Sequence, residues 1–130
     1  MPTILIIDDS WLTRRGVKRI LSTQGYEINE AENGRQAMEI ILAKDRIADA
    51  IILDLLMPEM NGIEFLEKLN EHNIKIPVIV LTADIQHTVK TKCIGLGAIA
   101  FINKPPEPDN LVKIVNGLFC KLPNNCKSDN

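Results

Sequence analysis

The stretch TILIIDDS, residues 3–10, joins a short run typical of a buried β-strand to a pair of acidic residues, Asp8 and Asp9. Three more runs of strand length lead into a polar residue: AIIL into Asp54, PVIVL into Thr82 and AFIN into Lys104. Parallel strands in an α/β sheet bring their carboxyl ends to one edge, where such folds bind their ligands. Residues far apart in the sequence can therefore meet there, and their spacing predicts one shared site.

The apolar runs also predict the fold class. Runs at residues 3–7, 50–53, 77–81 and 100–102 alternate with longer segments in which apolar residues recur at helical spacing. Nearly continuous apolar character is typical of strands that helices cover on both faces, whereas the alternation in YEINE, residues 26–30, is typical of an edge strand. The sequence therefore predicts an α/β fold with a doubly wound sheet.

Helical segments follow each of these runs. The helix over residues 11–24 has Ser10 as its N-cap and Gly25 as its stop, and the Asn33-Gly34 turn leads into the next helix. Residues 85–96 form the weakest helix because β-branched residues interrupt it, and we expect a weak helix to move easily. The apolar residues expected along the later helices are Ala37, Met38, Ile41 and Leu42; Ile63, Phe65, Leu66 and Leu69; Ile85, Cys93, Ile94 and Leu96; and Leu111, Val112, Ile114, Val115 and Leu118.

Size, charge and cysteine content exclude several classes of protein. A chain of 130 residues suits one domain, and its net charge of −2, with lysine and arginine scattered, gives no electrostatic footprint for nucleic acid. The three cysteines include no CxxC motif, so neither a disulfide framework nor a zinc site is indicated. No stretch is apolar enough for a membrane span. We therefore expect a cytoplasmic protein that neither binds DNA directly nor inserts into a membrane.

Four motifs in this order, LIIDDS, ILDLLMPEMNG, VLTAD and AFINKPP, resemble those of the receiver domain of two-component response regulators. The resemblance covers residues 3–118. It implies a CheY-like, flavodoxin-like fold: five parallel strands in the order 2-1-3-4-5, with five helices. We expect residues 1–122 to form the receiver domain, without an output domain, and residues 123–130 to form a polar tail.

The chain departs from the family at a few positions. Asn61 stands where aspartate often precedes Gly62, and either residue suits a turn. Phe101 occupies the position of the switch aromatic, where tyrosine is also common, and it has no hydroxyl group. The resemblance implies a cis bond between Lys104 and Pro105, a form found almost only before proline.

The same residues suggest a chemistry. A carboxylate can attack phosphorus, and Asp54 is the proposed phosphoacceptor. Asp8, Asp9 and Asp54 would bring three negative charges together, which Lys104 alone cannot balance but a hard divalent cation can, so Mg²⁺ is expected, with Mn²⁺ as the alternative ion. The resemblance adds the backbone carbonyl of Leu56 as a further metal ligand.

Signalling would follow from the phosphorylated state. Lys104 would stabilise charge on the phosphoryl oxygens, and the Thr82 hydroxyl would donate to one of them, leaving space for Phe101 to move as a switch. By resemblance the phosphoryl donor is a sensor histidine kinase, and a separate protein reads the face formed by helix 4, strand 5 and helix 5. We expect a monomer that catalyses only its own phosphorylation and dephosphorylation. Its output, in chemotaxis or as a phosphorelay intermediate, stays open.

Three other functions compete with this interpretation. A haloacid-dehalogenase-type phosphatase carries Asp-x-Asp after its first strand, whereas Asp8 and Asp9 are adjacent and no acid follows Asp54 in Leu55-Leu56. A flavodoxin-like electron carrier cradles a phosphate after strand 1, and two aspartates there would repel it. A constitutive interaction module has no chemical need for three clustered carboxylates, which are costly to hold together.

Overall fold

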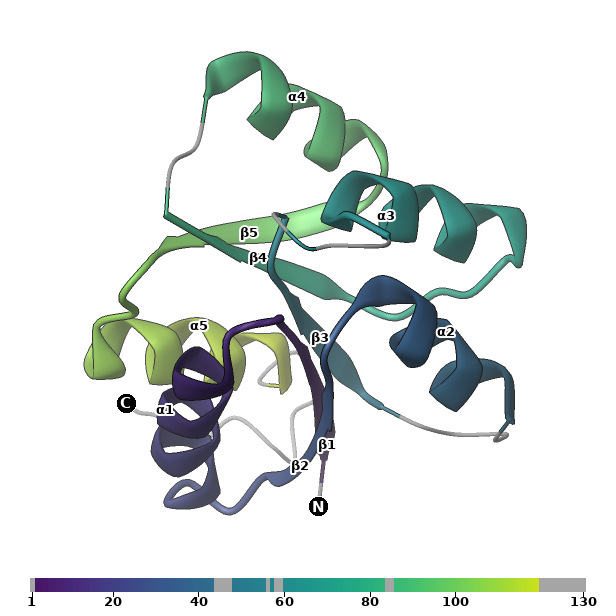
Figure 1. Cartoon of the computed structure of the whole chain (residues 1–130). Coiled ribbons are helices and arrows are strands. Elements are labelled where there is room, and N and C mark those ends of the chain that lie inside the picture. Colours follow the sequence, from purple (N-terminus) through teal and green to yellow (C-terminus); the bar gives the residue numbers. More distant parts are fainter. Residues whose placement is uncertain (1, 44–47, 56, 58–59, 84–85, 120–130) are drawn as a thin grey trace.

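The computed structural model describes residues 2–43, 48–55, 57, 60–83 and 86–119. Strands and helices alternate along this part of the chain (Figure 1). The strands are β1 (Thr3–Ile7), β2 (Glu27–Ala31), β3 (Ala50–Leu53), β4 (Val78–Thr82) and β5 (Ala98–Asn103). The helices are α1 (Trp11–Ser22), α2 (Gly34–Ala43), α3 (Gly62–Glu71), α4 (His87–Gly95) and α5 (Pro108–Phe119).

The strands form one parallel sheet in the order β2-β1-β3-β4-β5, as predicted. The register of strand pairing decides which residues meet at the carboxyl edge of the sheet. Ile7 of β1 pairs with Leu53 of β3, so the next residues, Asp8 and Asp54, leave the sheet side by side. Thr82 pairs with Asn103 at the other end of the edge, and Lys104 follows at once. The acidic and basic candidates therefore start from the same edge.

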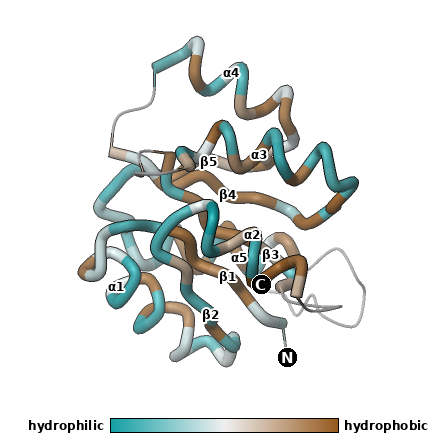
Figure 2. Tube along the Cα trace, turned by 45° about the vertical axis from the view of Figure 1, so that its right-hand side comes forward, coloured by the Kyte–Doolittle hydropathy of each residue, from teal (hydrophilic) through white to brown (hydrophobic). Residues whose placement is uncertain are grey.

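Helices cover both faces of the sheet, in agreement with the predicted doubly wound fold (Figure 1). On one face α1 and α5 pack over a cluster that includes Ile4, Ile6 and Leu111. On the other face α2, α3 and α4 pack over a second cluster that includes Leu5, Phe65 and Cys93. The inner strands β1, β3 and β4 are correspondingly apolar, whereas the edge strand β2 is largely hydrophilic (Figure 2). Full burial of one such aliphatic or aromatic side chain stabilises a fold by about 1.5–3 kcal/mol.

Helix starts agree closely with the sequence signals. Ser10 is the N-cap of α1, where its hydroxyl accepts a hydrogen bond from the backbone N–H of Thr13. Asn61 caps α3, and together with Glu64 it forms a capping box in which each side chain accepts from the other's backbone N–H. Such caps satisfy amide groups that the first helical turn leaves without intrahelical partners. Asn61 therefore caps α3 at the position where aspartate often precedes the glycine.

Some expected details differ. Helix α1 ends at Ser22 rather than Gln24, because Thr23 already caps it and Gly25 turns the chain with φ of +91°. Leu42 and Ile94 are at helical spacing but lie on outer faces, with 57% and 54% of their surface exposed. Helix α4 buries only Cys93 among its residues, as its weak apolar pattern suggested. No helix in the described ranges is both long and apolar enough to cross a membrane.

Candidate functional site

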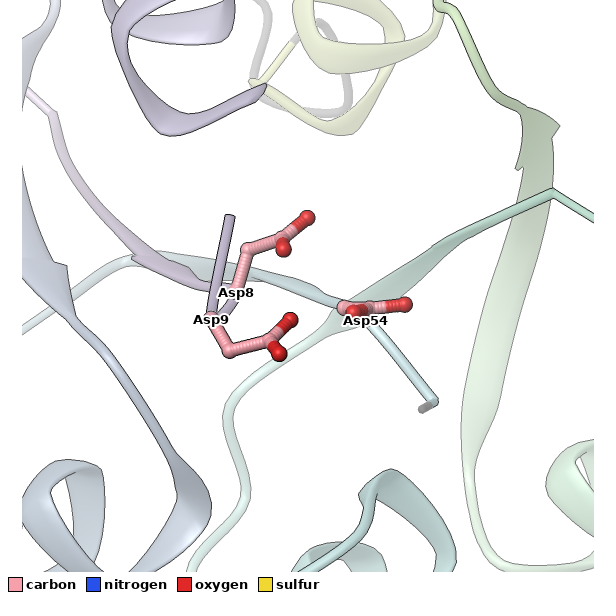
Figure 3. Close-up of side chains that lie close together, drawn as sticks. All are labelled: Asp8, Asp9 and Asp54. Carbon is pink, nitrogen blue, oxygen red and sulfur yellow. The ribbon is translucent and has the colours of Figure 1, made fainter. Parts of the chain in front are cut away.

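Three carboxylates gather at the carboxyl ends of β1 and β3 (Figure 3). One oxygen from each of Asp8, Asp9 and Asp54 can be chosen so that all lie within 4.8 Å of one another. Asp8 and Asp54 are almost completely buried, with 1% and 4% of their surface exposed, whereas Asp9 faces solvent. Burial at a strand end, next to like charges, is a costly place for a carboxylate unless a cation is near.

Lys104 supplies the cation that the described residues bring to this site. Its Nζ atom lies 2.9 Å from Asp8 Oδ2 and 3.4 Å from Asp54 Oδ2. Burial by itself lowers the pKa of Lys104, but its contacts with Asp8, and to a lesser extent Asp54, outweigh burial and raise the pKa above the usual 10.5. The ammonium is therefore charged at neutral pH. The peptide bond that follows, to Pro105, is cis, as the resemblance implied.

Asp8 is held on its other side by the start of α1. Its Oδ1 atom accepts a hydrogen bond of 2.8 Å from the backbone N–H of Ser10, the residue that caps the helix. Its own backbone N–H donates to the carbonyl of Ala31 at the end of β2, at 3.1 Å. These contacts fix the carboxylate of Asp8 before any ion binds. Asp9 is the more exposed member of the pair.

Gly62 explains the Asn-Gly sequence beside the site. A Cβ atom at Gly62 would lie 2.7 Å from Leu55 Cα and 2.8 Å from the carbonyl oxygen of Asp54. Side-chain carbons essentially never approach backbone atoms so closely. The first residue of α3 must therefore lack a side chain for the helix to start against the loop that carries Asp54.

Thr82 and Phe101 lie on the two strands farther along the sheet. Thr82 ends β4 with 1% of its surface exposed, and its carbonyl accepts a hydrogen bond of 2.9 Å from the Lys104 backbone N–H. The partly buried Phe101 packs against the core cluster under α2, α3 and α4. The ammonium of Lys90, on α4, lies 5.5 Å from the centre of its ring. Phe101 therefore connects the sheet to the weakest helix.

The donor set fits a hard divalent cation. Three carboxylate groups converge, and a single ammonium contacts two of them, so the described cluster keeps an excess of negative charge. Oxygen ligands of this kind suit Mg²⁺, which keeps several of its waters and needs few protein ligands. Leu56, whose carbonyl was expected to complete the site, lies outside the described residues.

One buried charged residue near the site was missed from the sequence. Among the described residues, Arg14 is the buried polar residue besides Asp8, Asp54 and Thr82, with 8% of its surface exposed. A signal was present: Arg14, Val17 and Leu21 follow one another at helical spacing and form the buried stripe of α1. A positive charge on an apolar stripe predicts a hydrogen-bonding or acidic partner for that side chain, because such a residue is seldom buried unpaired.

Residues 4–116 match the family described as the response regulator receiver domain. The chain belongs to this family. The receiver also resembles a solved structure of the Vibrio cholerae chemotaxis protein CheY4, with a TM-score of 0.82 and 30% identity, over 90% of this chain and 98% of that one. The predicted family and fold are thereby confirmed.

Two relatives with sequences similar to the receiver are much longer proteins. A protein-glutamate methylesterase/protein-glutamine glutaminase of Treponema denticola is 47% identical in an alignment of 118 residues that covers 85% of this chain and 31% of that protein. The transcriptional regulatory protein SrrA of Staphylococcus aureus is 41% identical over 116 residues, 89% of this chain and 47% of that protein. The receiver thus spans less than half the length of either relative, and their whole-protein activities do not transfer with it.

Proposed function

We propose that this receiver accepts a phosphoryl group on Asp54 from a phosphohistidine of a sensor histidine kinase. An oxygen of the Asp54 carboxylate would attack phosphorus, the phosphorus–nitrogen bond would break, and the imidazole would leave with the bonding electrons and take a proton from solvent. The product is an acyl phosphate on Asp54. The phosphoryl group leaves the kinase and stays on the receiver, so in this proposal the protein signals rather than turning over a substrate.

The observation that carries the proposal is the position of Asp54: a buried carboxylate at a strand end, 3.4 Å from a charged ammonium. Phosphoryl transfer needs little covalent machinery beyond positioning and stabilisation of charge on the transferred oxygens. Lys104 can supply that stabilisation because it already lies between Asp8 and Asp54 and is charged at neutral pH.

Asp8, Asp9 and Asp54, with the backbone carbonyl of Leu56, would hold Mg²⁺, or Mn²⁺ in its place. A bound ion offsets the carboxylate charges and polarises the phosphoryl oxygens. The chain's own part is to keep these carboxylates together, with Asp8 fixed by Ser10 and by Lys104. Receiver domains generally bind Mg²⁺ in such an acidic pocket, and the described donor set is consistent with that.

Phosphorylation would then change the shape of the face formed by α4, β5 and α5. The Thr82 hydroxyl would donate to a phosphoryl oxygen, and Phe101 would move into the space that Thr82 leaves. The contacts of Phe101 with the core and with Lys90 of α4 support this coupling. A separate partner protein would read the changed face, in chemotaxis or in a phosphorelay, and the likeness to CheY4 supports the former.

We extend the same proposal to the whole chain. It would act as a cytoplasmic monomer, with a receiver domain over residues 1–122 followed by a polar segment over residues 123–130, and without direct contact to nucleic acid or membrane. The scattered basic residues and net charge of −2 support the last point.

Intact mass spectrometry after incubation with acetyl phosphate tests the proposed chemistry. We expect one phosphoryl adduct that requires Mg²⁺ and is absent from the Asp54→Asn variant, which keeps the size of the side chain and removes its nucleophile. Addition of EDTA should abolish the adduct in the wild type. Loss of Mg²⁺ affects the reaction while leaving the protein folded, which a circular dichroism spectrum checks.

A wild-type protein that binds Mg²⁺ but gains no adduct would contradict the proposal and favour an interaction module that works without phosphorylation. An adduct that survives in Asp54→Asn would move the phosphoacceptor to another residue. Hydrolysis of added phosphoesters at steady turnover would instead revive the phosphatase interpretation.

A further inference from the structure

Arg14 lies where a charged side chain needs strong partners. It belongs to the buried stripe of α1, with Val17 and Leu21, and only 8% of its surface is exposed. Burial of an unpaired charge is costly, so a guanidinium in this position is retained only if its donors are used. The contacts of Arg14 identify the acceptors of its hydrogen bonds.

The guanidinium joins the loop after β1 to the edge strand β2. One terminal nitrogen donates a hydrogen bond of 2.6 Å to the backbone carbonyl of Asp8. The Nε atom donates at 3.0 Å to Glu30, on β2, in a contact that is also an ion pair. Arginine suits this role because its planar group presents several donors in fixed directions. The exposed Lys18 lies 3.5 Å from the other oxygen of Glu30 and adds a weaker contact.

Together with Arg14, three other residues bind the backbone and the carboxylate of Asp8. Its backbone N–H donates to Ala31, its carbonyl accepts from Arg14, its Oδ1 accepts from Ser10, and its Oδ2 faces Lys104. The carbonyl contact fixes the peptide group between Asp8 and Asp9, and thereby the direction in which Asp9 leaves the strand. The exposed Asp9 is the carboxylate with most freedom to turn away from its two neighbours.

We propose that Arg14 is a positioning residue for the divalent-cation site. By linking the Asp8 carbonyl to Glu30 of β2, it keeps the Asp8 and Asp9 carboxylates directed toward the ion. The inference rests on the proposed function in one respect, the binding of a divalent cation at this cluster. Mg²⁺ demands near-octahedral geometry, so small errors in ligand direction weaken its binding. Groups that orient metal ligands from behind change affinity by about 10–100-fold when they are removed.

The dissociation constant for Mg²⁺ tests this inference. Trp11 is the single tryptophan and lies at the start of α1, so its fluorescence can follow the titration. Binding of Mn²⁺, followed by electron paramagnetic resonance of the free ion, gives a second readout that does not depend on Trp11. The test variant Arg14→Met keeps the unbranched stem and removes both hydrogen bonds. We expect it to raise the dissociation constant by roughly tenfold or more.

Val17→Ala is the matched control. It removes packing from the same buried stripe of α1, and Val17 belongs to the core cluster on that face rather than to the site. We expect Val17→Ala to be destabilised in urea while its dissociation constant stays within about twofold of the wild type. Equal weakening in both variants would overturn the inference, because α1 stability rather than Arg14 would then set the affinity. A wild-type affinity in Arg14→Met would overturn it directly.

Arg14→Lys covers the case in which Arg14→Met does not fold. Lysine keeps the charge but cannot donate in two fixed directions, so we expect the dissociation constant to rise several-fold, and an unchanged value would reject the positioning role. Absence of ion binding in the wild type itself would reject the proposed metal site along with this inference. Wild-type binding with unaffected Arg14 variants would reject the inference alone.

Discussion

Asp9 illustrates a conflict between stability and function at the scale of one residue. Its carboxylate belongs to three that lie within 4.8 Å of one another, with Lys104 contacting the other two. Without a divalent ion, the like charges repel. We expect Asp9→Asn to raise the free energy of unfolding by on the order of 0.5–1 kcal/mol at low salt, and this gain to vanish when Mg²⁺ is present.

Urea denaturation with and without Mg²⁺ measures this effect. Glu67→Gln is the control, since it removes an acid from the exposed surface of α3, away from the cluster, and should leave stability nearly unchanged in both conditions. If Asp9→Asn were no more stable than the wild type at low salt, repulsion within the cluster would not be a significant cost.

Cys93 allows a prediction about pH. Burial raises the pKa of its thiol above the usual 9.0, although the charge of Lys92 acts in the opposite direction. The folded state thus favours the neutral thiol. Its contribution to stability is fully present below pH 9.0 and is lost as the pH rises through the raised pKa.

Alkylation followed by mass spectrometry checks that the Cys93 thiol is buried and neutral in the folded protein, in a variant that carries Cys120→Ser and Cys126→Ser. At pH 8 we expect iodoacetamide to leave Cys93 unmodified in buffer and to modify it fully in urea, because the thiolate is the reactive form and burial blocks access. Rapid modification in buffer would mean that α4 opens often enough to expose the thiol.

At the scale of elements, Gly62 and Gly16 make a matched pair. A Cβ atom at Gly62, the first residue of α3, would meet Leu55 and the Asp54 carbonyl at less than 3 Å, whereas nothing lies within 4 Å of a Cβ atom at Gly16 in α1. We expect Gly62→Ala to lower the free energy of unfolding by about 1–3 kcal/mol and to slow phosphorylation of Asp54. Gly16→Ala should stabilise the protein by up to about 1 kcal/mol.

Thermal unfolding and the adduct assay together test this pair. A Gly62→Ala variant as stable and as reactive as the wild type would show that α3 can start farther from the Asp54 loop at no cost. A loss of stability in Gly16→Ala would indicate that the exposed face of α1 has a constraint that the described contacts do not reveal.

Helix α4 should be the least protected helix among those described. It buries Cys93 alone, whereas α3 buries Phe65, Leu66 and Leu69 and starts with a capping box. Figure 1 shows α4 at the top of the view, at the far end of the layer that it shares with α3. We expect amide hydrogens of α4 to exchange about tenfold or more faster than those of α3, measured by hydrogen–deuterium exchange. Equal protection would weaken the role of α4 as a movable element.

At the scale of the whole molecule, the sheet was the most predictable feature. The bounds of β1 and β3 agree with the expected residues, since both strands are short, almost entirely apolar and followed by aspartate. The strand order needed the family resemblance, because apolar runs do not say which strands are neighbours. The convergence of Asp8, Asp54 and Lys104 then follows from the sheet's register.

What the sequence did not reveal depends on partners distant in the chain. Strand β5 begins at Ala98, before the predicted AFI run, because the apolar Ala98 also pairs with β4, across a register shift that no sequence pattern indicates. Ile94 has the spacing of a core residue but is 54% exposed, since α4 packs on the core through Val89 and Cys93 instead. Arg14 could be placed on the buried stripe, yet its partners, the Asp8 carbonyl and Glu30, come from two other segments.

The position of Lys104 links the site to the order in which the chain is made. The carboxylates come from β1 and β3, but the ammonium that contacts them follows β5, the last strand of the sheet. A nascent chain on the ribosome therefore exposes its acidic cluster well before it can complete the site. Under the proposed chemistry, a kinase would meet an incomplete acceptor on nascent chains that have not yet reached Lys104, so that the phosphoryl mark is confined to molecules in which β5 has joined the sheet.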